Sequence, residues 1–235
     1  MNAYHKMIKN LDKKVSKYYK KLDKKVGNSV PNETVFRLLG NNNFNCKNKR
    51  ILDIGIGNGD NLLEFRRREH CEIFGIDIKK KVLKIFINQN NLNPKNFFSC
   101  DLNYNFPKIK KKMDLILCKD TIYYVEQNRQ LVLFDEVYKN LKKGGFFLMQ
   151  YIQCQFKQKP KKKEFSFNLN NKTEFEKLNK YFQIKNPIPF LENKHIMKLI
   201  KYKKFQLINN IFDISTHTKN KKIVLTVNRF LLFKK

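Results

Sequence analysis

A short apolar run that contains one acid leads directly into three closely spaced glycines. The run is Arg50–Ile54 with Asp53 inside it, and Gly55, Gly57 and Gly59 follow. Because apolar residues with helical spacing begin soon afterwards, the glycines should form a turn between a strand and a helix. Glycine lets the backbone adopt positive φ and approach a ligand closely, and the helix start offers unpaired N–H groups. The pattern predicts a nucleotide-like ligand at the carboxyl ends of parallel strands.

The spacing of the glycines departs from the fingerprint of dinucleotide-binding proteins. That fingerprint needs its third glycine three residues after the second, but Gly59 comes sooner and Asp60 occupies the required position. An aspartate at the start of the helix would also repel a pyrophosphate. Asp53, two residues before the first glycine, instead suits a cationic or amine-bearing ligand.

This D-x-G-x-G-x-G pattern, from Asp53 to Gly59, resembles the first motif of the class I S-adenosylmethionine-dependent methyltransferases. In that family the loop holds the amino-acid end of the cofactor. The resemblance covers about Asn32 to Phe233 and breaks down in a polar, basic insert at residues 155–190. It implies S-adenosylmethionine as the cofactor.

Two further acids stand at the ends of the next apolar runs. Asp77 ends the run Cys71–Asp77, where a carboxylate can accept both hydroxyls of a ribose; the alternative is that it caps the helix expected at 79–90. Asp101 and Leu102 end the run that begins at Phe97. In the methyltransferase pattern this acid and its apolar neighbour meet the adenine.

The resemblance implies roles for residues along these strand ends. They are Asp53, Gly55, Gly57 and Asn58 for the methionine end of the cofactor, Asp77 with Ile78 beside it for the ribose, Asp101 and Leu102 for the adenine, and Cys118 for the floor of the site. No catalytic base is assigned, because methyl transfer needs one only for an acceptor that is protonated. The candidates on the acceptor side are Asp120, Tyr124 with its neighbour Tyr123, and His195. An aromatic pair is also typical of a core, and a lone histidine is typical of a surface.

Five apolar runs and the helices between them predict an α/β fold. We expect a three-layer sandwich with a mostly parallel seven-stranded sheet that ends in an antiparallel hairpin. The five runs are 50–54, 71–77, 97–102, 113–118 and 146–152, and the hairpin strands are 205–214 and 222–233, joined by 217–221. The helix over 127–142 should stop at Gly144-Gly145. In the resembling family the last strand inserts antiparallel between its neighbours.

The chain divides into a core and two additions. Residues 1–40 predict a helical cap, with one amphipathic helix over 1–26 and a second from Ser29 to Gly40. Residues 41–154 and 191–235 form the predicted core. The basic insert 155–190 is either a lid over the substrate or a solvated surface.

Lysine and arginine outnumber aspartate and glutamate by 50 to 20, which gives a formal net charge of +30. Such a field favours a polyanion such as RNA. The lysines are spread along the whole chain, however, and abundant lysine, asparagine, isoleucine and phenylalanine is also what an A/T-biased coding sequence produces. We therefore do not expect nucleic acid to be the main partner.

The cysteines and the apolar runs bear on the compartment. Five cysteines stand far apart with no C-x-x-C pair. This spacing argues against a disulfide framework or a metal site and favours reduced thiols in a cytoplasm. The first residues lack the apolar core of a signal peptide, and no apolar run is long enough to span a membrane. We expect a cytoplasmic protein.

Three functions remain open. The first is S-adenosylmethionine-dependent methyl transfer to a small-molecule acceptor, such as a sugar or a phosphate-bearing metabolite. The second is an RNA methyltransferase, although the N-P-P-[FYW] signature of amino-group enzymes is replaced by Cys118-Lys-Asp-Thr. The third is a non-catalytic protein that retains the fold.

Overall fold

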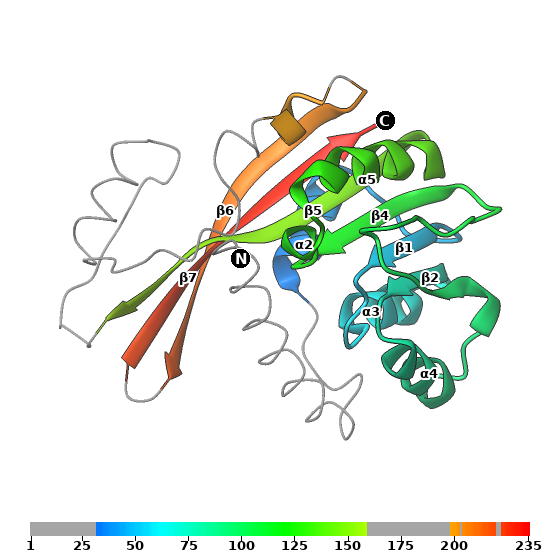
Figure 1. The fold of residues 1–235 in the computed structure, drawn as a ribbon, viewed down its shortest axis with the longest axis horizontal. Coiled ribbons are helices and arrows are strands. Elements are labelled where there is room, and N and C mark those ends of the chain that lie inside the picture. The colour runs from blue at the N-terminus through cyan, green and yellow to red at the C-terminus, as the bar shows by residue number, and fades with distance from the viewer. Residues whose placement is uncertain (1–31, 159–197, 203, 220–221) are drawn as a thin grey trace.

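The structure is a computed structural model that describes residues 32–158, 198–202, 204–219 and 222–235. The predicted helix 1–26, most of the predicted insert 155–190 and His195 lie outside these ranges. Within them, a single twisted sheet lies between helices on both of its faces (Figure 1). This is the predicted three-layer α/β arrangement.

The sheet has seven strands in the order β3-β2-β1-β4-β5-β7-β6. The strands are β1 (Arg50–Ile54), β2 (Glu72–Asp77), β3 (Phe97–Ser99), β4 (Met113–Lys119), β5 (Leu141–Gln158), β6 (Gln206–Lys219) and β7 (Lys222–Lys234). Strands β1 to β5 pair in parallel, and β7 runs antiparallel between β5 and β6. The mostly parallel sheet and its inserted last strand are confirmed.

Each face of the sheet buries its own apolar cluster. One cluster joins the sheet to α2 (Glu33–Asn41), α3 (Asp60–Glu69) and α4 (Lys80–Gln89). The other joins it to α5 (Gln127–Asn140) and to the segment around Leu199 and Phe205. Strand residues alternate between the two, as Ile51 and Leu52 do in β1. Among the helices in the described ranges, none combines the length and apolarity that a membrane crossing requires.

Local sequence explains where the helices begin. Asn32 caps α2 by accepting a hydrogen bond from the Val35 N–H, as an N-cap side chain does. Helix α3 starts at Asp60, immediately after Gly59. On the opposite face, the Phe134 ring of α5 packs edge-on against Phe147 of β5. These contacts fix the helices over a sheet whose strand ends carry the polar residues.

The antiparallel ribbon is longer than the sequence predicts. Strand β5 continues to Gln158, so residues 155–158 belong to the sheet and not to the predicted insert. Pairing of β6 with β7 continues to Lys219 opposite Lys222, so the predicted connection 217–221 is too long. Figure 1 shows these three strands reaching beyond the parallel strands at the lower left. Backbone pairing holds these polar residues in strands, whereas composition alone indicated loops.

Two other boundaries were also wrong. Helix α5 ends at Asn140, and Gly144-Gly145 lies inside β5, where Gly144 has a φ of +76°. The Gly144 N–H donates to the Lys235 carbonyl, so the chain end holds this bend instead of a helix stop. Strand β3 ends at Ser99, which leaves Asp101 and Leu102 in the following turn and not in the strand.

Replacing Gly59 by alanine should lower the free energy of unfolding by about 2 kcal/mol or more. Its φ is +74°, and an added Cβ would lie 2.1 Å from the Phe86 ring. Gly40→Ala is the matched control, because Gly40 lies within α2 and an added Cβ meets no described atom within 4 Å. The control should raise the free energy of unfolding by about 0.5–1 kcal/mol. Urea denaturation measures the free energy of unfolding of each variant. Equal stabilities of Gly59→Ala and the wild type would show that the close approach of Gly59 to Phe86 does not fix the turn.

Candidate functional site

The candidate site lies where the strand order reverses. From β1 the chain proceeds outward to β2 and β3, and then crosses back so that β4 pairs with the other side of β1. In open parallel sheets the crevice outside the carboxyl ends of the strands at such a reversal is the usual ligand site. The glycine turn stands directly after β1 at this point.

The glycine turn is tied to the end of the neighbouring strand. Gly55, Gly57 and Gly59 have φ angles of +76°, +52° and +74°. The N–H groups of Gly55 and Ile56 both donate to the Ile76 carbonyl, at 2.8 and 3.1 Å. The turn therefore lies over the tips of β1 and β2.

The three glycines are needed for different reasons. A Cβ on Gly55 would lie 2.0 Å from Thr121 Oγ1, and one on Gly59 would collide with Phe86. A Cβ on Gly57 would meet only the Gly55 carbonyl, at 3.9 Å. Packing within the protein thus accounts for two of the glycines, whereas Gly57 faces space that the described residues leave open.

Asp77 connects the second strand to the turn. Its Oδ2 accepts a hydrogen bond from the Gly57 N–H at 3.1 Å, and its Oδ1 accepts one from the Lys79 N–H at 2.8 Å. Burial raises the pKa of this carboxyl group, while the backbone hydrogen bonds from Lys79, Gly57 and Ile78 and the charge of Lys79 oppose the rise. A carboxylate has about four acceptor positions, so these three backbone hydrogen bonds leave Asp77 capacity for a ligand.

Asp53 is buried with one oxygen unmatched. Its side chain is 3% exposed, and Oδ1 has no hydrogen-bond partner among the described residues. Burial raises the pKa of Asp53 to about 8; the charge of Lys119 opposes this rise, and the charges of Asp77 and Asp60 add to it. A cation placed beside Asp53 would favour its ionised form.

The third acid belongs to a turn that joins two strand ends. Asp101 Oδ1 accepts from the Asn103 N–H at 2.9 Å. Asn103 in turn accepts from the Glu126 N–H at 2.7 Å and donates to the Tyr124 carbonyl at 3.3 Å. The loop after β3 is thereby fixed to the loop after β4.

The two apolar residues predicted beside these acids differ in exposure. Leu102 is half-buried and packs against the core cluster on the α5 face. Ile78 is 57% exposed directly after Asp77. An exposed aliphatic side chain at a strand tip offers a flat apolar contact to a ligand.

The residues predicted around the end of β4 are only partly brought together. Cys118 is fully buried in the core, which raises the pKa of its thiol. Asp120 adopts a φ of +51° at the tip of β4. Tyr124 is half-buried against the core, and the side chains of Tyr123 and His195 lie outside the described regions.

Sequence reasoning missed several polar residues here. The Lys119 ammonium lies 3.4 Å from Asp120 Oδ2. Gln150 of β5 donates through Nε2 to Asp120 Oδ1 at 3.0 Å and to Asn228 Oδ1 of β7 at 3.1 Å. The available signal was a single glutamine in the apolar run 146–152.

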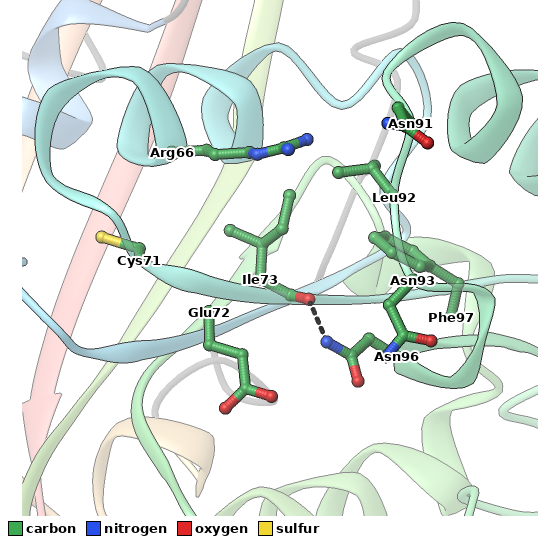
Figure 2. Close-up of a pocket in the computed structure, with 9 residues that line it drawn as sticks. All are labelled: Arg66, Cys71, Glu72, Ile73, Asn91, Leu92, Asn93, Asn96 and Phe97. Carbon is green, nitrogen blue, oxygen red and sulfur yellow. Dashed lines mark hydrogen bonds between the residues drawn. The ribbon is translucent and has the colours of Figure 1, made fainter.

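A separate pocket of about 170 Å³ lies at the amino end of β2 (Figure 2). It is lined by Glu72 and Ile73 of β2, by Arg66 of α3 and by the loop ahead of β3. Figure 2 shows the Asn96 amide donating to the Ile73 carbonyl, at 3.2 Å, on one side of it. Small-molecule sites usually measure about 300–1,000 Å³, and this pocket is at the opposite end of the strands from the glycine turn. It is not the candidate site.

Comparison with known proteins identifies the family. Residues 45–215 match the sequence pattern of the family described as "Methyltransferase domain". The chain belongs to this family. It is an S-adenosylmethionine-dependent methyltransferase of class I, and S-adenosylmethionine is the cofactor of the family.

Related proteins agree with this assignment. The methyltransferase is 24% identical to carboxy-S-adenosyl-L-methionine synthase from Campylobacter lari, over 72% of this chain and 74% of that protein. An S-adenosylmethionine-dependent methyltransferase from Clostridium acetobutylicum has the same fold, with a TM-score of 0.58 and 15% identity over 94% of this chain and 98% of that one. Magnesium protoporphyrin IX methyltransferase from Synechocystis follows, with a TM-score of 0.53 and 12% identity over 86% and 77%.

The contribution of Asp53 to the stability of the ligand-free methyltransferase should fall as the pH rises from about 4 to about 8. Asp53 ionises near pH 3.8 when it is unfolded but only near pH 8 when it is folded, so the folded state binds more protons in this window. Its contribution is complete below the unfolded pKa and is lost as the pH passes the folded pKa.

Asp53→Asn removes this titration and should give a flatter dependence of melting temperature on pH. The quantity to compare is the difference in melting temperature between wild type and variant at each pH, because the other ionisable groups are the same in both proteins. A difference that stays constant across the window would contradict the raised pKa of Asp53.

Proposed function

We propose that this methyltransferase transfers the methyl group of S-adenosylmethionine to a small-molecule acceptor at the carboxyl ends of β1, β2 and β4. The buried Asp53 carboxylate with its unmatched oxygen carries this proposal. It is a group that a protein without a ligand hosts at a cost, and that a cationic ligand would stabilise. The amino group of the cofactor's methionine end is such a cation.

The glycine turn suits the same end of the cofactor. The open side of Gly57 would admit a ligand that a side chain would displace. Gly55 and Asn58 flank it in the turn and would complete the contact with the methionine end. The Gly57 N–H is already held by Asp77, so the turn is fixed in this shape before a ligand arrives.

The other strand tips would hold the nucleoside. Asp77 would accept the ribose hydroxyls with the hydrogen-bonding capacity that its backbone donors leave. Ile78 would contact the nucleoside with its exposed side chain. Asp101 and Leu102 would meet the adenine, and the buried Cys118 would support the floor from within the core.

Bound S-adenosylmethionine supplies an electrophilic methyl group on a positively charged sulfur. The protein's task is to align an acceptor with that methyl group and to exclude water. Asp120 is our candidate for this task; its position at the tip of β4, held by contacts with Lys119 and Gln150, supports the choice. A carboxylate there could take the proton of an acceptor that must lose one.

The distribution of charge favours a small acceptor over RNA. Asp77 and Asp120 stand at the carboxyl edge of the sheet and would repel a phosphate chain laid across it. Lysines such as Lys111 and Lys142 lie at the opposite edge, paired with acids of that edge. A sugar fits the acidic edge better than a phosphate-bearing metabolite. The solved relative from Synechocystis, named for magnesium protoporphyrin IX, also acts on a small molecule.

Asp77→Asn should weaken binding of S-adenosylmethionine by about tenfold or more, because it removes a charge and an acceptor from the ribose contact. Asp114→Asn is the matched control. Asp114 accepts from the Arg50 N–H and from Lys142 at the amino end of β4, so its loss should affect stability and leave cofactor affinity within about twofold. Isothermal titration of both variants tests this, and an unchanged affinity in Asp77→Asn would remove Asp77 from the site.

The acceptor class can be tested with labelled cofactor. The methyltransferase is incubated with S-adenosylmethionine labelled in its methyl group and with two substrate pools, a low-molecular-weight cell extract and bulk RNA. We expect label in the small-molecule pool only. Transfer to RNA that declines steeply with added salt would instead establish the RNA enzyme. Binding of the cofactor without transfer to either pool would favour a non-catalytic protein.

A further inference from the structure

Gln150 of β5 is the most deeply buried polar side chain beside Asp120. Its side chain is 2% exposed, and it lies on the sheet face covered by α2, because it is two residues from Leu148 of that cluster and every second residue of a strand points to the same face. Its Nε2 atom donates to Asp120 Oδ1 at 3.0 Å and to Asn228 Oδ1 at 3.1 Å. The amide therefore links β5 to the tip of β4 and to β7, which are its neighbours in the sheet (Figure 1).

The orientation of this amide follows from its partners. An ionised carboxylate can only accept hydrogen bonds, so the atom that faces Asp120 must be the nitrogen of Gln150. Both N–H groups of that nitrogen are then used. The oxygen, Oε1, is fully buried and has no hydrogen-bond partner in the regions of the chain that the structure describes.

The backbone conformation of Asp120 also indicates a functional site beside Gln150. Asp120 has a φ of +51°, an uncommon conformation for a residue other than glycine. It is held there by its N–H, which donates to the Gln150 carbonyl at 2.9 Å, as well as by the side-chain contact. Unmatched buried acceptors and backbone strain of this kind gather at functional sites.

The position of the pair relative to the glycine turn is also defined. Thr121, the next residue after Asp120, lies so close to Gly55 that a Cβ there would be 2.0 Å from its hydroxyl. Gln150 stands one strand further from the turn, opposite Lys119 in the β4–β5 register. It is thus next to the proposed cofactor site and on its acceptor side.

We propose that Gln150 Oε1 and the Asp120 carboxylate form the acceptor subsite, and that they bind an acceptor with two donor hydrogens, one for each oxygen: an amino group or a pair of neighbouring hydroxyls. This inference rests on the proposed function and narrows its substrate class to amines and to alcohols with neighbouring hydroxyls. A carboxylate or phosphate at this point would bring only acceptors to a buried oxygen and a carboxylate, and would be rejected.

The subsite fits the chemistry of transfer to such a group. The acceptor's lone pair forms a bond to the methyl carbon, the bond between carbon and sulfur breaks, and its electron pair stays on the sulfur, which becomes neutral. The proton that the acceptor loses passes to Asp120. Gln150 holds the acceptor through the hydrogen bond that it receives, and its donation to Asp120 fixes the carboxylate in place.

Gln150→Met tests the subsite, because methionine matches the length of glutamine without its amide. With labelled cofactor and the active small-molecule fraction, the variant should lose about tenfold or more in kcat/KM, chiefly through KM for the acceptor. Its affinity for S-adenosylhomocysteine should stay within about twofold of wild type. Tyr151→Phe is the matched control, a neighbouring buried polar group that contacts Arg229 on the other face and should leave both quantities unchanged.

Two outcomes of these measurements would overturn the proposal. One is unchanged kinetics in Gln150→Met, and the other is an equal loss of cofactor affinity, which would assign Gln150 to the cofactor instead. Gln150→Leu serves as a second apolar variant if the methionine variant does not fold. The product gives an independent result: a methyl ether or N-methyl group survives mild alkali, whereas release of volatile methanol would show a carboxylate acceptor and contradict the subsite.

A binding experiment separates failure of the subsite from failure of the proposed function. In the presence of S-adenosylhomocysteine, millimolar ethanolamine should raise the melting temperature of the wild type but not of Gln150→Met, and acetate should raise neither. An equal response of the two proteins to ethanolamine, or none in the wild type, would remove the subsite even if methyl transfer is demonstrated. A response confined to the wild type would keep the subsite even if no acceptor pool is methylated.

Discussion

The parallel register of β1, β2 and β4 is the constraint on which the site depends. Ile54 of β1 pairs with Ile76 on one side and with Cys118 on the other. The three strands therefore end at the same level, and the residues that follow them must share one edge. Glycines at the end of β1, an acid at the end of β2 and a second acid after β4 become neighbours although they are far apart in the sequence. Nothing in any single segment of the chain could bring them together.

That edge concentrates negative charge in a protein that is strongly basic. Asp53 and Asp77 are buried there and repel one another, which contributes to the raised pKa of Asp53. At the amino edge the opposite crowding occurs, where burial and the charge of Lys112 lower the pKa of Lys235. The net charge of +30 thus says little about the site, because local arrangement and not the total decides which ligand a crevice favours.

The fold could be predicted well from the sequence because hydrophobic periodicity, the spacing of apolar runs and the positions of glycines are local signals. The runs of β1 and β4 are largely buried and could be predicted as strands from composition alone, and the short link between the last two strands required an antiparallel pair. The polar ends of β5 and β6 were missed because only pairing with a neighbouring strand makes them strands. Gly144 was misread for a similar reason, since glycine after a helix usually ends it, and here the contact with Lys235 determines its role.

Some residues of the candidate site could likewise be predicted from local sequence, and others could not. Asp53, Asp77 and the glycines could be named from the sequence because they follow apolar runs at a recognisable spacing. Gln150 could not be named from the sequence, because a glutamine inside a strand usually has no functional role. Only its neighbours in the folded protein distinguish it.

Asp53 and Gln150 nevertheless share one physical property, a buried oxygen that accepts no hydrogen bond from the described regions of the chain. Folding does not favour such atoms, because each loses its hydration without a replacement. A ligand that donates hydrogen bonds or carries positive charge restores what folding removed. The two oxygens, on β1 and on β5 with β4 between them, therefore indicate which ligands this part of the sheet favours: a cationic one beside the glycine turn and a hydrogen-bond donor beside β5.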